Sequence, residues 1–198
     1  MRRKLAVITS NILNPFLLSF AVIVLLSFKS TSNPWEAFKW SAISIGLSVL
    51  PIFVIVIYLV QKGKLDNIFI NLRKQRTKVY LLSGAWAGIG CLVLFLMRAP
   101  TVIVATFIVG LVAALIFMGI NLLWKISIHT AFASASITLM IIMYGGAGVL
   151  AALMLPPVAW ARIEMKLHSP AQVIGGALLS AVITLLIFHA FGLISTKI

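Results

Sequence analysis

The sequence predicts an all-α protein, a polytopic bundle of six or seven transmembrane helices. Of its 198 residues, 62% are apolar and 10% are charged, whereas soluble domains average about 45–50% apolar and about 25% charged residues. The apolar residues gather in stretches of about 20, which is the length that a helix needs to cross a bilayer. The single cysteine, Cys91, excludes a disulfide scaffold.

Seven apolar stretches are candidates for the membrane spans. Pro100 separates the third stretch from the fourth, and Gly145-Gly146 divides the long run from Ser127 to Ala161. If that run were one bent helix, the count would be six. The stretches are residues 11–28, 39–61, 80–97, 101–124, 127–144, 147–162 and 170–193. Because the chain has no long linker and no tandem repeat, we expect residues 1–198 to form a single membrane domain. The first stretch follows the basic start Met1-Arg2-Arg3-Lys4, and we expect it to be a retained signal anchor.

The charge of the chain is one-sided, with 16 Lys and Arg against three acids and a net charge of +13. Since the basic residues lie between apolar stretches, we expect membrane lipids and phosphate groups as partners, and no nucleic acid. Seven spans place twelve basic residues on the side of the N-terminus and four on the other, which predicts that the N-terminal side is cytoplasmic. Glu36, Asp66 and Glu164 are too few for a Mg²⁺ or two-metal site, so we expect no metal and no cofactor.

Three polar segments fall on the N-terminal side: the loop from Lys62 to Tyr80, the start of the fifth stretch, and the connection between the last two stretches. In that order they contain Arg73, Arg76 and Lys78; Lys125, Ser127 and His129; and Arg162, His168 and Gln172. Each has a plain structural interpretation. The loop would lie beside anionic headgroups, Ser127 would cap a helix, and Arg162 would snorkel to the membrane boundary.

The shared side of the membrane favours a second interpretation. In a helical bundle the three segments can converge, which would gather several cations and two histidines around one pocket. Such a cluster repels itself without an anion, and a phosphate group would satisfy it because guanidinium groups bind phosphate oxygens through two donors. The helix that starts at Ser127 adds backbone N–H groups and a positive dipole end. His189 lies near the opposite end of its stretch, and we interpret it as structural.

The motifs in these segments resemble the type 2 phosphatidic acid phosphatase (PAP2) superfamily over about residues 60–192. That family carries K-x6-R-P, P-S-G-H and S-R-x5-H-x3-D. The third motif reads here Ala161-Arg162-x5-His168-x3-Gln172, followed by Val173 and by Gly175-Gly176, and the second reads Ile126-Ser127-Ile128-His129. The first motif is weaker: by spacing it is Asn71-x6-Lys78-Val79, and Arg73-x-x-Arg76 resembles the pattern of a divergent branch.

The resemblance implies an integral membrane phosphatase that acts on a lipid phosphate or polyprenyl (di)phosphate through a phosphohistidine, in a bacterial or archaeal cell membrane. It implies His168 as the nucleophile, His129 as the general acid and Gln172 as the residue that orients His168. It also implies phosphate-binding roles for Arg162, Ser127, Arg73, Arg76 and Lys78. We add Lys125 to this set because it belongs to the same basic segment as Ser127. The N-terminal-side position of these residues puts the expected site on the cytoplasmic face.

Departures from the family motifs leave a second function open. Gln172 stands where the family has Asp, and its amide can accept a hydrogen bond from His168 but cannot stabilise charge that builds on the ring. Ile128 replaces Gly and Ile126 replaces Pro. The alternative is therefore a catalytically degenerate PAP2-like protein that binds a lipid phosphate or supports a partner membrane protein. A small transporter is disfavoured because it would need charge within the spans. The sequence leaves open whether the chain forms homo-oligomers.

Overall fold

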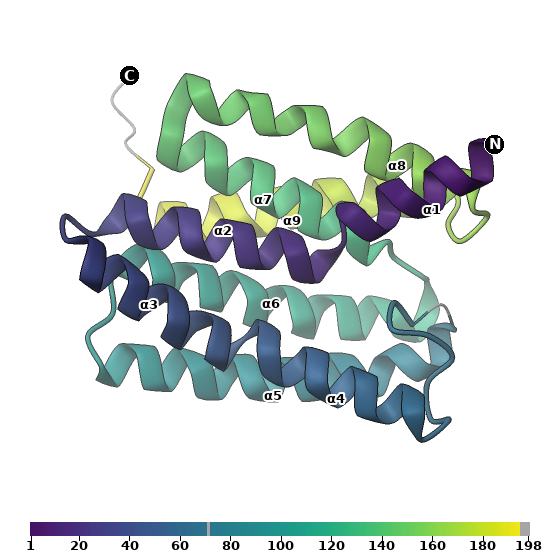
Figure 1. The fold of residues 1–198 in the computed structure, drawn as a ribbon, viewed down its shortest axis with the longest axis horizontal. Coiled ribbons are helices and arrows are strands. Elements are labelled where there is room, and N and C mark those ends of the chain that lie inside the picture. The colour runs from purple at the N-terminus through teal and green to yellow at the C-terminus, as the bar shows by residue number, and fades with distance from the viewer. Residues whose placement is uncertain (71, 195–198) are drawn as a thin grey trace. The chain divides into compact units, whose positions relative to one another are not determined.

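The computed structural model describes residues 1–70 and 72–194, and within them the chain forms helices and turns without a strand (Figure 1). Within the described residues, six helical stretches are long and apolar enough to cross a membrane, which confirms the predicted all-α membrane fold. They are Arg2–Ser30, Pro34–Gln61, Arg73–Leu96, Thr101–Leu123, Ile128–Glu164 and Pro170–Ala190. Asn71 of the weak first motif, and Lys197, which was counted among the basic residues, lie outside the described residues.

The chain divides into two compact units, one of Met1–Leu26 with Ile126–Ile198 and the other of Ser27–Lys125. Each unit is described here by itself. The single membrane domain expected for residues 1–198 therefore stays a prediction.

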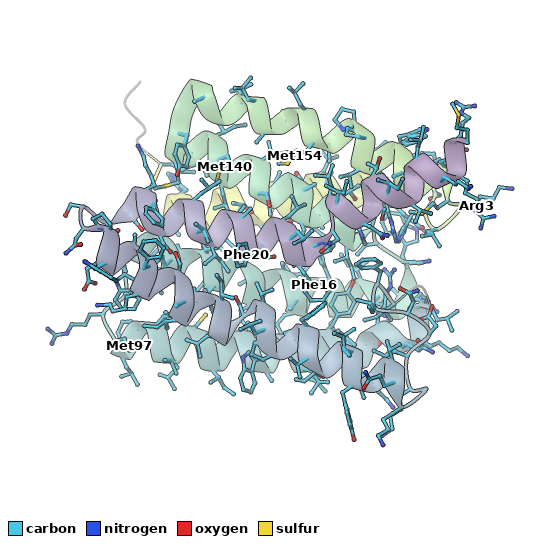
Figure 2. The ribbon with its side chains drawn as sticks, in the orientation of Figure 1. Arg3, Phe16, Phe20, Met97, Met140 and Met154 are labelled. Atoms are coloured by element: carbon cyan, nitrogen blue, oxygen red, sulfur yellow. The ribbon has the colours of Figure 1, made fainter. Side chains whose placement is uncertain are left out.

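The first unit begins with a short helix that the sequence did not indicate. Helix α1 (Arg2–Ile12) precedes α2 (Pro15–Ser30), so the first predicted span corresponds mainly to α2. Asn14 stabilises the break between α1 and α2. Its side-chain oxygen accepts hydrogen bonds from the N–H groups of Phe16 and Leu17 at 2.9 and 3.0 Å. This is an N-cap followed by proline in the first turn, which is a common helix start. Figure 2 shows Arg3 pointing outward from α1, consistent with its exposure.

A helical hairpin makes up most of the remaining first unit. Helix α7 (Ile128–Tyr144) ends at Gly145, whose φ of 57° suits glycine. The 3₁₀ helix η1 (Gly145–Met154) and α8 (Leu155–Glu164) then run back along α7, as Figure 1 shows. The reversal is tight, because a Cβ on Gly148 would collide with the backbone of Met140. The predicted division at Gly145-Gly146 is confirmed, and the stretch Ile128–Glu164 consists of two antiparallel arms.

Helix α9 (Pro170–Ala190) completes the first unit and packs against α7, while α1 packs against α8. Leu18 of α2, Ala133 of α7 and Val158 of α8 form a buried cluster at their common contact. These contacts fix the mutual positions of α1, α7, α8 and α9, which are the helices that carry the candidate site.

The second unit contains α3 (Pro34–Leu47), α4 (Val49–Gln61), α5 (Arg73–Leu96) and α6 (Thr101–Leu123). Helix α5 begins at Arg73, so the predicted loop from Lys62 to Tyr80 is wrong in its second half. The helix extends past its apolar stretch because polar groups of α6 pair with its first turns: the Asn121 amide donates to the Arg73 carbonyl and to the Thr77 hydroxyl at 3.0 and 3.1 Å. Deeper in the same pair of helices, Gly90 of α5 lies directly against the Phe107 ring.

Candidate functional site

One end of the first unit brings together three chain segments that are distant in sequence. Helices α7 and α9 begin there and α8 ends there, on the same end as the start of α1 (Figure 1). Four of the predicted site residues at this end are buried, namely Ser127, His129, Arg162 and His168. Gln172 is half-buried.

The turn after α8 places His168 next to Arg162. Lys166 adopts a φ of 57°, a left-handed conformation that ends the helix. The N–H groups of Leu167 and His168 then both donate to the Arg162 carbonyl, at 3.2 and 3.3 Å. The five residues between Arg162 and His168 form the last residues of α8 and the turn that follows it. This turn brings the two residues to the same end of the unit.

Gln172 orients the ring of His168. Its side-chain oxygen Oε1 lies 3.2 Å from His168 Nδ1 and also accepts the backbone N–H of Ser169 at 3.2 Å. Because an amide oxygen only accepts, a hydrogen bond in this contact requires the tautomer that carries its proton on Nδ1. In the neutral ring, Nε2 then keeps its lone pair.

The same glutamine caps helix α9. Ser169 is the N-cap, its hydroxyl accepts the Gln172 N–H at 3.3 Å, and the two residues form a reciprocal capping box with Pro170 at the first helical position. Gln172 therefore has a structural role as well as the contact with His168.

The beginnings of α7 and α9 are held together by backbone contacts. The Ser127 N–H donates to the Gln172 carbonyl at 3.2 Å, and the Thr130 hydroxyl donates to the Val173 carbonyl at 3.0 Å. Gly176 allows this approach, since a Cβ there would lie 2.6 Å from the Ser127 carbonyl oxygen. The segments that carry His129 and His168 are thereby joined.

The Ser127 hydroxyl does not cap α7, although Ser127 is the N-cap residue of that helix. The side chain is fully buried, with 0% exposed, and its Oγ has no hydrogen-bond partner within residues 1–70 and 72–194. A buried hydroxyl without a partner is costly. The plain interpretation of Ser127 as a side-chain cap is therefore wrong, and its role in binding phosphate stays a prediction.

Arg162 contacts a residue that the sequence did not indicate. Its Nη1 donates to the hydroxyl of Ser10 on α1 at 2.9 Å, and both residues are 2% exposed. No motif contains Ser10. The single clue in the sequence is the pair of small residues Ala6 and Ser10, one helical turn apart, in an otherwise basic and bulky segment.

The other predicted phosphate-binding residues belong to the second unit. Arg73 donates from Nη1 to the carbonyls of Asn121 and Leu122 at 3.2 and 2.7 Å, at the end of α6. Arg76 is 1% exposed and donates from Nε to the Ile70 carbonyl at 2.8 Å. Lys78 is exposed and Lys125 is half-buried. That these four residues share a pocket with the histidines stays a prediction.

His189 lies at the far end of α9 and is exposed. It follows His168 by 21 positions, most of them in α9, which rises about 1.5 Å per residue. The expectation that it does not belong to the same site is confirmed.

No protein-family model, no curated protein and no solved structure matches this chain. The function must therefore be argued from the residues of the site.

Proposed function

We propose that this protein is an integral membrane phosphatase of the PAP2 type that hydrolyses a lipid-linked phosphate. The observation that carries the proposal is the contact between His168 Nδ1 and Gln172 Oε1, which leaves Nε2 as the nucleophilic atom. The buried Ser127 hydroxyl and the buried Arg162 guanidinium lie on the adjoining segments and supply the donors that a phosphate group requires.

In the proposed mechanism, His168 Nε2 attacks phosphorus and the bond from phosphorus to the lipid oxygen breaks. His129 gives its proton to that oxygen, so the lipid leaves as an alcohol, or as a monophosphate from a diphosphate. Water then attacks phosphorus and gives a proton back to His129, the bond from phosphorus to His168 Nε2 breaks, and inorganic phosphate is released. Arg162, the Ser127 hydroxyl and the positive end of α7 balance the charge on the phosphoryl oxygens, which is the main demand of phosphoryl transfer.

The substrate class follows from the surroundings of the site. The helices that carry it are long and apolar enough to cross a bilayer, so a substrate with acyl or prenyl chains reaches the site from the membrane. Phosphatidate, phosphatidylglycerophosphate and polyprenyl (di)phosphates fit this description. The twelve-to-four distribution of basic residues supports a cytoplasmic site, in a bacterial or archaeal cell membrane.

A second function is favoured by the capping role of Gln172. If the amide is present only to cap α9, the protein would be a degenerate relative that binds a lipid phosphate without hydrolysing it or that supports a partner membrane protein. The phosphatase and the lipid-phosphate-binding relative would both bind phosphate, but only the phosphatase would turn it over.

Initial rates of phosphate release from one short-chain lipid phosphate separate the two functions. We expect wild type to release phosphate, His168→Ala to be inactive, and Gln172→Asp to be about 10- to 100-fold faster than wild type, because a carboxylate stabilises the charged ring. Since Asp is one methylene shorter, Gln172→Glu is the length-matched variant. If none of the four proteins hydrolyses a panel of lipid phosphates that they bind, the phosphatase is refuted and the binding protein remains.

A further inference from the structure

The hydrogen bond between Arg162 and Ser10 joins residues 152 positions apart in the chain. Ser10 lies on α1, outside the part of the chain that resembles the PAP2 superfamily. The contact therefore connects the N-terminal helix to the cation that is proposed to bind phosphate.

Small residues allow α1 to approach α8 closely. Ala6 and Ser10 lie one turn apart on α1 and are 0% and 2% exposed, as expected where two helix backbones meet. The bulky residues Leu5, Ile8 and Ile12 are exposed on other faces of α1. The packing thus brings a hydroxyl, and no larger side chain, to the guanidinium of Arg162.

The orientation of the guanidinium decides how well it binds phosphate. Arginine binds a phosphate group best through two parallel N–H donors, which requires the plane of the guanidinium to match the two oxygens. A hydrogen bond from Nη1 to a buried hydroxyl fixes that plane before the ligand arrives, and such preorganisation lowers the cost of binding.

We infer that Ser10 is a positioning residue that holds Arg162 in the orientation for binding a lipid-linked phosphate. The inference rests on the proposed function for the identity of the ligand. Ser10 acts through Arg162, whose guanidinium is proposed both to bind the phosphate group and to balance the charge on its oxygens during transfer.

The experiment measures affinity and turnover separately in the full-length protein in detergent. Short-chain phosphatidate is the probe; its Kd is measured by calorimetry in a His168→Ala background, and kcat and KM are measured without that change. We expect Ser10→Ala to weaken Kd about tenfold, as for the loss of a hydrogen bond to a charged group, and to lower kcat/KM at least tenfold, because Arg162 is also proposed to stabilise the transferring group. Ser180→Ala, which removes another buried serine from the same unit, should change none of these values.

A matched pair of variants isolates the hydroxyl from the shape of the side chain. Ser10→Thr and Ser10→Val have the same size, but only threonine keeps the hydroxyl. Both add a methyl group to the close contact between α1 and α8, so they are compared with each other, and threonine should bind phosphatidate about tenfold more tightly than valine.

A double-mutant cycle with Arg162→Lys distinguishes positioning from a general structural role. Lysine has no planar fork, so the valine-for-threonine change at position 10 should alter Kd by less than about twofold in that background. The inference is overturned if the valine-for-threonine change weakens phosphatidate binding equally in both backgrounds, or if it does not weaken binding in the arginine background.

The inference and the proposed function can fail independently. If the Kd for phosphatidate depends on the hydroxyl at position 10 as expected, but wild type releases no phosphate from the lipid phosphates that it binds, the phosphatase is refuted and the positioning role stands. If wild type hydrolyses phosphatidate and the hydroxyl at position 10 does not matter, the inference is refuted and the phosphatase stands. A protein that neither binds nor hydrolyses phosphatidate or any other lipid phosphate of the panel refutes both.

Discussion

Replacing Gly176 by alanine should separate the starts of α7 and α9 and remove most of the proposed phosphatase activity. A Cβ at this position would lie 2.6 Å from the Ser127 carbonyl oxygen and 3.0 Å from the Thr130 hydroxyl, whereas ordinary contacts begin at 3.4 Å. The nearest atom belongs to the backbone, so it cannot rotate away as a side chain would. The helices must therefore move apart by 3.4 minus 2.6, or 0.8 Å, at this contact.

That displacement acts directly on the site. The Ser127 N–H and the Gln172 carbonyl form their hydrogen bond at the same junction, and Gln172 orients His168. A shift of about 1 Å in catalytic geometry can lower the rate by about 10²-fold. Overpacking of this kind also costs about 1–3 kcal/mol of stability, so the variant should still fold.

The assay compares kcat on a short-chain lipid phosphate with the midpoint of thermal unfolding, on protein purified as a folded fraction in detergent. Gly146→Ala is the matched control, because no atom lies within 4 Å of a Cβ at that position. We expect the control to keep wild-type kcat and Gly176→Ala to lose about 10²-fold. A folded Gly176→Ala protein with unchanged kcat would refute the argument that the α7–α9 contact sets the geometry of the site.

Three further predictions concern the fold and its orientation. Arg73→Ala should lower stability by about 1–2 kcal/mol in thermal unfolding, because the carbonyls at the end of α6 lose their donor; the exposed Lys78→Ala should not, and equal midpoints would contradict the capping role of Arg73. Gly145→Ala should cost about 1–2 kcal/mol in the same assay, since its φ of 57° is left-handed, and an unchanged midpoint would contradict that strain. A cysteine at Lys64, introduced with Cys91→Ser, should react with an impermeant maleimide only after cells are opened; reaction in intact cells would overturn the cytoplasmic orientation.

The lengths of the apolar stretches were sufficient to predict the membrane helices, because a bilayer imposes a length on every span. The reversal at Gly145 was predictable from the backbone freedom of glycine, whereas the helix breaks at Asn14 and Ser48 were not predicted. Helix α1 and the first turns of α5 were missed because their residues are basic or polar, and apolar length is no guide there. The first turns of α5 depend on Asn121, 48 positions from Arg73, and the sequence gives no sign of that contact.

For the site, too, contacts between neighbouring segments of the chain could be predicted, and contacts between distant segments could not. The proximity of Arg162, His168 and Gln172 was predictable because it arises from one helix end, one turn and one helix start that are consecutive in the chain. The burial of the Ser127 hydroxyl without a cap, and the approach of Ser10 to Arg162, depend on packing between distant segments. Such contacts leave no local pattern, apart from the small residues that permit them.

Gln172 shows how a structural requirement and a chemical one can be met by one atom. A capping box needs an acceptor at the third helical position, and glutamine, glutamate or aspartate can supply it. Capping alone does not require a histidine at position 168. It also does not require that His168 Nδ1 contact the same Gln172 oxygen that accepts the Ser169 N–H. An oxygen that accepts from both groups fixes the tautomer of the ring, and it does so whether or not it carries a charge. The amide therefore preserves the orientation of His168, the proposed nucleophile, and gives up only the stabilisation of its charged form. For this reason the substitution at Gln172 predicts a slow phosphatase and not an inactive one.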